Sequence, residues 1–345
     1  MSAPEYPFDQ PPAAGSAAQV APGVYWLRMA LPFELDHINL WLLQDGTALE
    51  PHWFVVDTGL GNDATRAAWE KVFAGTLAGR TVRRVLVTHY HPDHVGNAGW
   101  LCSRTGAELW MTRADYLTVH AARHGAAGYS PEAQRDLFRA NGLDDAQANA
   151  LLARGGLYKS MVPDFPFSHR RLFEGEQIRI GGRSWRVIVG YGHAPEHASL
   201  YCEELKVLIS GDMLLPRIST NIAVRPVDPS SNPLRLFLDS IRRYRDLPAD
   251  VLVLPSHGLP FRGAHERVAR LEAHHADRLA ALQAHCATAP RSAADVLEVL
   301  FRRKLDTGQI FFAMGEAIAH LHCLHYDGRL SRTVGPDGIA RFASA

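Results

Sequence analysis

One short stretch constrains this chain more than any other: Thr88-His89-Tyr90-His91-Pro92-Asp93-His94. The segment before it, residues 82–87, is short, apolar and rich in valine, which predicts a buried strand. A strand that ends there releases three imidazoles and a carboxylate into a loop, where their donor atoms can converge on one point. Such nitrogen and oxygen donors suit zinc and neighbouring transition metals. A histidine-rich surface loop is the simpler alternative, but the strand in front of the motif favours a metal site.

Three later strand-like segments end in residues of the same kind. Residues 187–189 lead to His193, residues 207–209 lead to Asp212, and residues 251–254 lead to His257. Each has an ordinary explanation when taken alone, since an aspartate before a loop is commonly a cap and Ser-His-Gly is commonly a turn. Together the four strand ends predict one metal site with seven candidate ligands. These are His89, His91, Asp93, His94, His193, Asp212 and His257.

This set resembles the metallo-β-lactamase superfamily, and within it the glyoxalase II-like hydrolases, from about Gly23 to Gly263. The resemblance implies an α/β fold, an αββα sandwich with a dinuclear site at the edge of its two sheets. It also implies that Asp57 orients a ligand through a hydrogen bond and that His197 supports the site without being a ligand. The implied ligand sets are His89, His91 and His193 for one metal, Asp93, His94 and His257 for the other, and Asp212 for both.

The implied cofactors are two divalent metal ions, zinc first, with iron or manganese as alternatives. Two such ions about 3.5–4 Å apart lower the pKa of a shared water, so that hydroxide attacks a polarised carbonyl or phosphoryl group. Asp93 and Asp212 are the expected catalytic residues, because they can position that hydroxide and handle its proton. The chain has no Gly-x-Ser-x-Gly motif and no Gly-x-x-x-x-Gly-Lys motif that would indicate a different chemistry.

Three substrate classes stay open. A small thioester of the acyl-CoA or acyl-glutathione type is favoured by the bridging aspartate, and a lactone or other small ester is the first alternative. Cleavage of RNA is the second, because some superfamily members with a winged-helix tail are ribonucleases. Residues 261–345 carry 11 Lys and Arg against 9 Asp and Glu, a small excess for a phosphate-binding face, so nucleic acid is not an expected partner.

Two departures from the family pattern bear on the substrate. Glu196 replaces the second glycine of the usual Gly-His-Thr-Pro-Gly-His, which is expected to alter the rim of the pocket. The tail also lacks a basic cluster of the kind that contacts glutathione in glyoxalase II. The run Arg302-Arg303-Lys304 is expected to be a solvated helix end.

The chain divides into three expected parts, the second of which contains an insertion. Residues 1–19 are a disordered or loosely docked arm, residues 20–263 are the catalytic domain, and residues 264–345 are a helical, winged-helix-like domain. Residues 112–168 are a helical insertion, with helices at 114–123, 131–140 and 144–153, in which Phe165 and Phe167 either form a substrate lid or only pack the insertion down. The tail is expected to hold helices at 264–285, 292–304 and 310–325, followed by a hairpin turn at Asp327-Gly328.

Composition indicates which partners and which cellular compartment to expect. The formal net charge is zero, so no overall field attracts nucleic acid or an anionic membrane. The four cysteines are scattered, which is typical of reduced thiols in the cytoplasm. The N-terminus lacks the features of a signal peptide and no apolar run reaches membrane-spanning length, so a cytoplasmic protein that acts on a small molecule is expected. The oligomeric state is left open.

Overall fold

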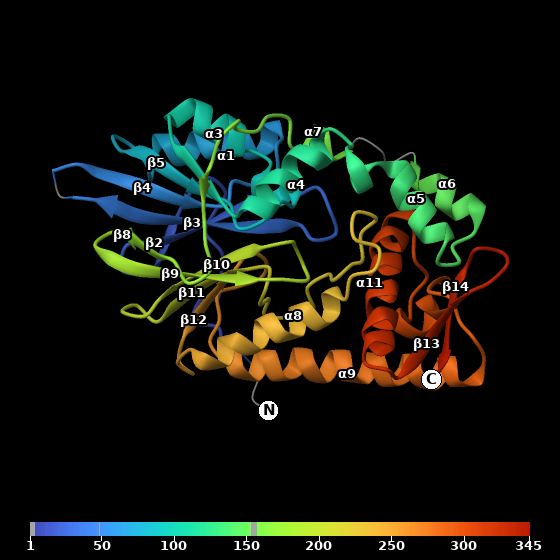
Figure 1. Ribbon diagram of the computed structural model, residues 1–345. Helices are drawn as coiled ribbons and strands as arrows, with labels where there is room; N and C mark the ends of the chain where they lie inside the picture. The colour runs from blue at the N-terminus through green and yellow to red at the C-terminus, as the bar shows by residue number, and fades with distance from the viewer. Residues whose placement is uncertain (1–3, 48, 153–156) are drawn as a thin grey trace.

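The computed structural model describes residues 4–47, 49–152 and 157–345, and two β-sheets form its centre (Figure 1). Within these residues the first sheet has the order β1-β2-β3-β4-β5-β6-β7 and the second has the order β12-β11-β10-β9-β8. The strands of the first sheet are β1 (Ala18–Ala21), β2 (Val24–Ala30), β3 (His37–Gly46), β4 (Pro51–Val56), β5 (Thr81–Leu86), β6 (Glu108–Met111) and β7 (Arg170–Arg171). Those of the second are β8 (Gln177–Ile180), β9 (Arg183–Gly190), β10 (His197–Cys202), β11 (Val207–Gly211) and β12 (Leu252–Pro255).

Large apolar side chains fill the space between the sheets. Trp26, Trp41 and Phe54 of the first sheet share one core cluster with Trp185 and Leu200 of the second. Helices cover both outer faces, as Figure 1 shows, and this arrangement is the αββα sandwich expected from the sequence. The covering helices are α1 (Asp63–Ala74) and α3 (Ala98–Thr105) on the first sheet, and α8 (Pro233–Arg242) and α9 (Ala264–Thr288) on the second.

Strand direction brings the predicted ligand loops together. In the first sheet β5 pairs in parallel with both β4 and β6, and in the second sheet β11 pairs in parallel with β12. The carboxyl ends of neighbouring parallel strands lie at the same edge of a sheet, so the loops that follow them are neighbours. The loops that follow β5, β11 and β12 contain most of the residues predicted to bind metal, and the loop that follows β4 contains Asp57.

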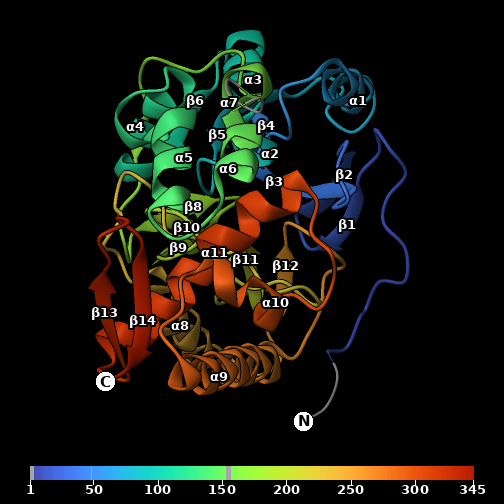
Figure 2. The same ribbon diagram turned by 90° about the vertical axis from the view of Figure 1, so that its right-hand side faces the viewer.

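The insertion predicted at residues 112–168 is helical. Its helices begin and end within a few residues of the expected positions, although residue 153 of the third predicted helix lies outside the described residues. Phe138 and Leu151 of the insertion belong to the same core cluster as Ile310 and Met314 of the tail, and Figure 2 shows the two parts next to each other. The elements are α4 (Arg113–Arg123), the 3-10 turn η1 (Ala127–Tyr129), α5 (Pro131–Arg139), α6 (Asp145–Leu152) and α7 (Leu157–Met161).

The tail differs from the prediction at two places. The helix expected at residues 292–304 is limited to a 3-10 turn, η3 (Ala294–Val296), and one turn of helix, α10 (Leu297–Leu300). The hairpin turn expected at Asp327-Gly328 is wrong, because these residues end α11 (Thr307–Tyr326) and the hairpin turn lies at residues 335–339. That turn connects β13 (Leu330–Val334) to β14 (Ala340–Ser344).

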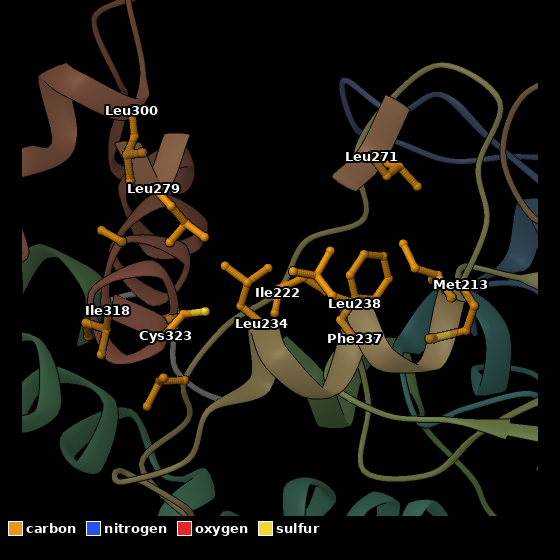
Figure 3. Packing of buried hydrophobic residues seen from close by; sticks show 14 of the residues in the cluster. Met213, Ile222, Leu234, Phe237, Leu238, Leu271, Leu279, Leu300, Ile318 and Cys323 are labelled. Carbon is orange, nitrogen blue, oxygen red and sulfur yellow. The ribbon is translucent and has the colours of Figure 1, made fainter. Parts of the chain in front are cut away.

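The tail and the second sheet share one hydrophobic core. Figure 3 shows Leu234, Phe237 and Leu238 of α8 among side chains from α9 and α11, such as Leu279 and Ile318. Helix α9 begins at residue 264, where the sequence predicted a new domain. Because the core is continuous across this point, the tail contributes to the stability of the sheet that it covers. The predicted division into domains stays a prediction.

The described part of the N-terminal arm is docked. Glu5 and Arg262 pair through two backbone hydrogen bonds, and Phe8 contacts Trp26 edge-on with 6.4 Å between ring centroids. Strand β1 then adds Ala18–Ala21 to the edge of the first sheet. Residues 1–19 were expected to be either disordered or loosely docked. From residue 4 onward, the structure shows this arm in contact with the rest of the protein. Among the described helices, none combines the length and apolarity needed to cross a membrane.

Candidate metal centre

The seven candidate ligands lie in two neighbouring groups at one edge of the sandwich. His89 and His91 follow β5, His193 follows β9, and together with Asp212 after β11 they form the first group. The second group contains Asp93, His94 and His257. Within each group the nearest donor atoms all lie within 4.8 Å of one another. Below, His89, His91 and His193 are called the three-His group, and Asp93, His94 and His257 are called the Asp93 group.

The three-His group has the spacing of a coordination shell. Nε2 of His89 is 2.9 Å from Nδ1 of His91 and 3.1 Å from Nε2 of His193. Oδ2 of Asp212 lies 3.3 Å from Nε2 of His193 and 4.0 Å from Nε2 of His89. Two ligands that each lie 2.0–2.1 Å from a tetrahedral ion are roughly 3.4 Å apart. These donor atoms therefore fit one small divalent cation.

Asp212 faces both groups through its two oxygens. While Oδ2 lies against the three-His group, Oδ1 is 3.5 Å from Nε2 of His94 and 3.5 Å from Nε2 of His257. Oδ2 of Asp93 completes the second group at 3.4 Å from Nε2 of His257 and 3.6 Å from Nε2 of His94. One carboxylate is thus placed to bridge two cations.

Two polar atoms of this centre are buried without a hydrogen-bond partner among the described residues: Nε2 of His94 and Oδ1 of Asp212. A buried polar atom without a partner is costly, and native structures usually give each one a partner. Both atoms lie on the side of the centre that faces the Asp93 group. A cation bound there would be a partner for each of them. The donor set and its unpaired atoms therefore fit the two divalent metal ions.

The pKa shifts of the histidine ligands differ between the two groups. Burial and the neighbouring imidazoles hold the pKa of His89 and of His91 well below the ordinary value, so both rings are neutral donors. Burial opposes charge on His94 and His257 as well, but the nearby carboxylates raise the pKa of His94 well above its ordinary value and that of His257 to about 10. Despite its burial, Asp212 has a pKa well below the ordinary range because of His257 and His94. The carboxylates therefore interact mainly with His94 and His257, and the imidazoles of His89 and His91 are the ones that stay neutral.

Asp57 orients His94 from a strained backbone position. Its φ of 63° is in the left-handed region that side chains other than glycine rarely adopt. Oδ2 accepts a hydrogen bond from Nδ1 of His94 at 2.8 Å, and Oδ1 accepts one from the backbone N–H of Thr88 at 2.8 Å. This geometry turns Nε2 of His94 toward the centre, which is the supporting role that the sequence predicted for Asp57.

Backbone carbonyls fix two further imidazoles. Nδ1 of His257 donates to the carbonyl of His37 at 2.8 Å, and Nδ1 of His193 donates to the carbonyl of Asn221 at 2.8 Å. In both rings Nε2 is therefore the atom left for a metal. His197 is different, because its Nε2 accepts the backbone N–H of Asp212 at 3.1 Å and burial lowers its pKa to about 3. His197 holds the backbone of Asp212 and is not in either group.

The structure also reveals a supporting residue that the sequence reasoning missed. Buried Asp115, in the first turn of α4, accepts the backbone N–H of Tyr90 at 2.9 Å and that of Glu196 at 2.7 Å. It therefore connects the loop of His89 and His91 to the loop of His193. The spacing Thr112-x-x-Asp115 resembles a capping box and was the available signal, although Thr112 makes no cap and donates to the carbonyl of Glu196. The carboxylate of Glu196 accepts the N–H of Ala114 at 3.3 Å, so this departure from the family pattern ties the same loop to α4.

The two phenylalanines proposed for a lid have opposite environments. Phe165 is 4% exposed and packs beside Tyr116 in the core under the insertion, with ring centroids 5.3 Å apart. Phe167 is 98% exposed. The burial of Phe165 fits the packing alternative and the exposure of Phe167 fits a lid, and the lid itself stays a prediction.

Comparison with known proteins agrees with this geometry. Residues 35–257 match the model of the metallo-beta-lactamase superfamily, and residues 279–345 match the model of the metallo-beta-lactamase-like C-terminal domain. A beta-lactamase domain protein from Burkholderia ambifaria has a solved structure that is 48% identical, covers 99% of this chain and 98% of that one, and has a TM-score of 0.92. A metallo-beta-lactamase family protein from Thermus thermophilus is 32% identical over 95% of this chain and 100% of that one, with a TM-score of 0.78.

Relatives known by sequence extend the comparison. A probable metallo-hydrolase from Bacillus subtilis, YqjP, is 25% identical, and the match covers 86% of this chain and 91% of that protein. The hydroxyacylglutathione hydrolase GloC from Haemophilus influenzae is 26% identical over 50% of this chain and 68% of its own length.

Proposed function

Because the chain is a metal-dependent hydrolase of the metallo-beta-lactamase superfamily, we propose that it cleaves a small thioester of the acyl-CoA or acyl-glutathione type. The main observation in support of metal-dependent hydrolysis is the position of Asp212. Its two oxygens face the three-His group and the Asp93 group. The thioester part is supported by the similarity to a hydroxyacylglutathione hydrolase over half of the chain.

We assign the ligands to two positions that share Asp212. His89, His91 and His193 would hold the first ion, and Asp93, His94 and His257 the second. Zinc is the proposed metal, since imidazole nitrogen and carboxylate oxygen are its usual partners. When bound, two divalent ions supply an acidified water and polarise the carbonyl of the substrate.

The side chains of the chain itself would orient the reactants. Asp93 is the more accessible of the two inner carboxylates, with a side chain that is 20% exposed against 9% for Asp212. The imidazoles of His94 and His257 hold the pKa of Asp93 below its ordinary value although burial opposes this, so the group is an acceptor at neutral pH. Asp93 therefore accepts a hydrogen bond from the attacking water and aims its lone pair, while Asp212 holds the opposite side.

The four cysteines of the chain are free thiols: Cys102, Cys202, Cys286 and Cys323. Free thiols are typical of proteins in a reducing compartment, and they support our expectation that the protein works in the cytoplasm.

A substrate panel combined with metal analysis tests the proposal. Protein reconstituted with zinc, manganese or iron is assayed with an acyl-CoA, an acyl-glutathione, a lactone and an RNA oligonucleotide. We expect a thioester to have the highest kcat/KM and elemental analysis to find two metal ions per chain. Asp212→Ala should retain one ion or none and lose nearly all turnover. A variant that kept both ions and normal rates would overturn the ligand assignment, and faster cleavage of the lactone or the RNA would overturn the substrate class.

A further inference from the structure

His91 differs from the other four histidine ligands in the way its ring is held. In those four, Nδ1 contacts a residue outside the ligand set: Thr88 for His89, Asp57 for His94, Asn221 for His193 and His37 for His257. His91 instead turns its Nδ1 toward Nε2 of His89 at 2.9 Å, and its Nε2 has no hydrogen-bond partner among the described residues. The direction of this ring therefore depends on the backbone that carries it.

The donor atom of His91 makes this dependence strong. The two ring nitrogens of histidine are distinct, and Nδ1 is the one close to Cβ. Rotation of the side chain moves Nδ1 over a short range only, so it cannot restore the donor position when the backbone shifts. On one side Pro92 restricts the backbone, because a residue before proline favours an extended conformation, and His91 has φ −62° and ψ 143°. On the other side lies the peptide unit that contains the carbonyl of Tyr90.

Tyr158 of α7 holds this peptide unit. Its hydroxyl donates to the carbonyl of Tyr90 at 2.5 Å, and the two tyrosine rings are stacked with 6.3 Å between their centroids. Helix α7 also contacts α2 (Pro92–Val95), which begins directly after His91 (Figure 2). Because Asp115 accepts the N–H of Tyr90 at 2.9 Å, side chains of the insertion hold both peptide units that flank this residue.

The segment that carries Tyr158 is itself fixed from two sides. In the loop after β4, the N–H of Gly61 donates to the carbonyl of Met161 at 2.9 Å, and a Cβ on Gly61 would come within 2.4 Å of that oxygen. Glycine is therefore required at this close approach. From α4, the guanidinium of Arg123 donates to the carbonyls of Val162 and Pro163 at 2.8 Å each. The hydroxyl of Tyr158 thus has a defined position from which it can hold the ligand loop.

From these contacts we propose that Tyr158 is a positioning residue of the metal centre, which sets the direction of Nδ1 of His91 by holding the carbonyl of Tyr90. The proposal rests on the ligand assignment made above, and it gives the helical insertion a role in metal binding. The alternative is that the hydroxyl only fastens α7 to the rest of the protein. Loss of the hydroxyl lowers metal affinity in the first case and stability alone in the second.

Tyr158→Phe provides the test, because it removes the hydroxyl and keeps the ring. Zinc is titrated into the metal-free full-length protein in competition with a chelator. We expect one of the two binding steps to weaken by about 10-fold, which is the effect of losing a contact that orients a ligand. The absorption bands of the cobalt(II)-loaded protein should change as well, since they depend on the arrangement of the ligands. In the zinc-loaded protein kcat should fall while KM stays the same.

A double-mutant cycle shows whether the effect passes through His91. His91→Ala removes the ligand and should weaken the same binding step more strongly than Tyr158→Phe does. When the two changes are combined, Tyr158→Phe should cause no further loss of zinc affinity, because the carbonyl of Tyr90 then has no ligand to position. Equal losses with and without His91 would overturn the proposal, since Tyr158 would then act by another route.

Tyr116→Phe is the matched control, because Tyr116 of α4 donates its hydroxyl to another carbonyl of the insertion, that of Pro166, at 3.2 Å. It should leave zinc affinity and the cobalt spectrum unchanged. Thermal unfolding of the metal-free variants shows whether each one keeps its fold. A Tyr158→Phe protein that loses stability but binds zinc like the wild type would overturn the proposal.

These measurements need no substrate, so they separate the proposal from the proposed reaction. If the wild-type protein binds two zinc ions but cleaves no thioester, the reaction class is wrong and the zinc titrations still decide the role of Tyr158. If it binds neither zinc nor cobalt, the ligand assignment is wrong and the proposal is overturned with it.

Discussion

His193 and Asn221 are joined by a hydrogen bond of 2.8 Å from Nδ1 of the ring to the backbone carbonyl, and this bond connects the candidate metal centre to the C-terminal helices. Glu316 of α11 pairs with Arg278 of α9 at 2.7 Å, and both Arg278 and the side chain of Asn221 counter the rise that burial causes in the pKa of Glu316. The backbone carbonyl of Asn221 makes this contact, so α11 acts on His193 through the position of the segment 220–225.

The first prediction concerns this connection. Glu316→Ala should lower the metal affinity of the three-His group and kcat by about 10-fold, with a smaller change in KM, because His193 loses its fixed direction. Glu316→Gln should behave more like the wild type, since an amide keeps the shape and polarity of the side chain. Elemental analysis and steady-state rates measure both effects. Glu298→Ala, at an exposed position of α10, is the control, and equal metal content in Glu316→Ala and wild type would contradict the connection.

The second prediction separates strain from function at Asp57. Asp57→Ala and Asp57→Gly both remove the carboxylate that orients His94, so both should bind the metal of the Asp93 group about 10–100-fold more weakly. Their stabilities should differ, because a φ of 63° suits glycine and not alanine. We expect Asp57→Gly to be more stable than Asp57→Ala by about 1 kcal/mol in urea unfolding without metal. If the less stable variant alone lost metal, the effect of Asp57 would be structural rather than through His94.

The third prediction is a pH dependence from a pair of buried histidines away from the metal centre. Nδ1 of His275 in α9 lies 3.1 Å from Nε2 of His320 in α11, and Nδ1 of His320 donates to the carbonyl of Glu316 at 2.8 Å. Burial first, and then the neighbouring His320, His274 and Arg278, lower the pKa of His275 to about 2. Burial lowers the pKa of His320 to about 4, with Arg278 acting in the same direction.

Both rings are therefore neutral in the folded protein at pH values where they are charged in the unfolded chain. Because the unfolded state binds more protons below its pKa of about 6.5, the stability from this pair is complete above that pH and falls as the pH drops toward 4. The loss is at most about 1.4 kcal/mol per pH unit for each ring. Urea unfolding at pH 7.5 and pH 5 should show a smaller loss for His275→Leu than for wild type, while His285→Leu, at a partly exposed position of the same helix, should behave like wild type.

Local patterns in the sequence were sufficient for the sheets and for the ligands, for a physical reason. A buried strand has a short apolar pattern, and a ligand that follows it directly is placed by the end of the strand. His89 and Asp212 could therefore be proposed as ligands without any knowledge of their partners, and their donor atoms lie in one of the two groups that could hold a metal. The helix caps were equally local, as the hydrogen bond from the N–H of Thr65 to the side chain of Asn62 illustrates.

Contacts between distant segments could not be predicted in the same way. Asn221 acts through its backbone carbonyl, which every residue has, so its side chain gave no signal. The helix predicted at residues 292–304 ends at Leu300, since Asp306 and Gln309 form a capping box that starts α11 and the chain must turn before it. That capping box is visible in the sequence and could have corrected the prediction.

The last prediction concerns Asp115, which holds two ligand loops with one carboxylate. Asp115→Asn places an NH₂ group against one of the two backbone N–H groups, of Tyr90 or of Glu196, that the carboxylate accepts. A buried N–H without a partner costs about 1–3 kcal/mol, so the free energy of unfolding should fall by about that amount. Because the two loops carry His89, His91 and His193, the metal affinity of the three-His group should fall as well, and isothermal titration with zinc measures it. Asp136→Asn, at an exposed position of α5, is the control, and a variant that lost stability but bound zinc normally would limit Asp115 to holding the fold.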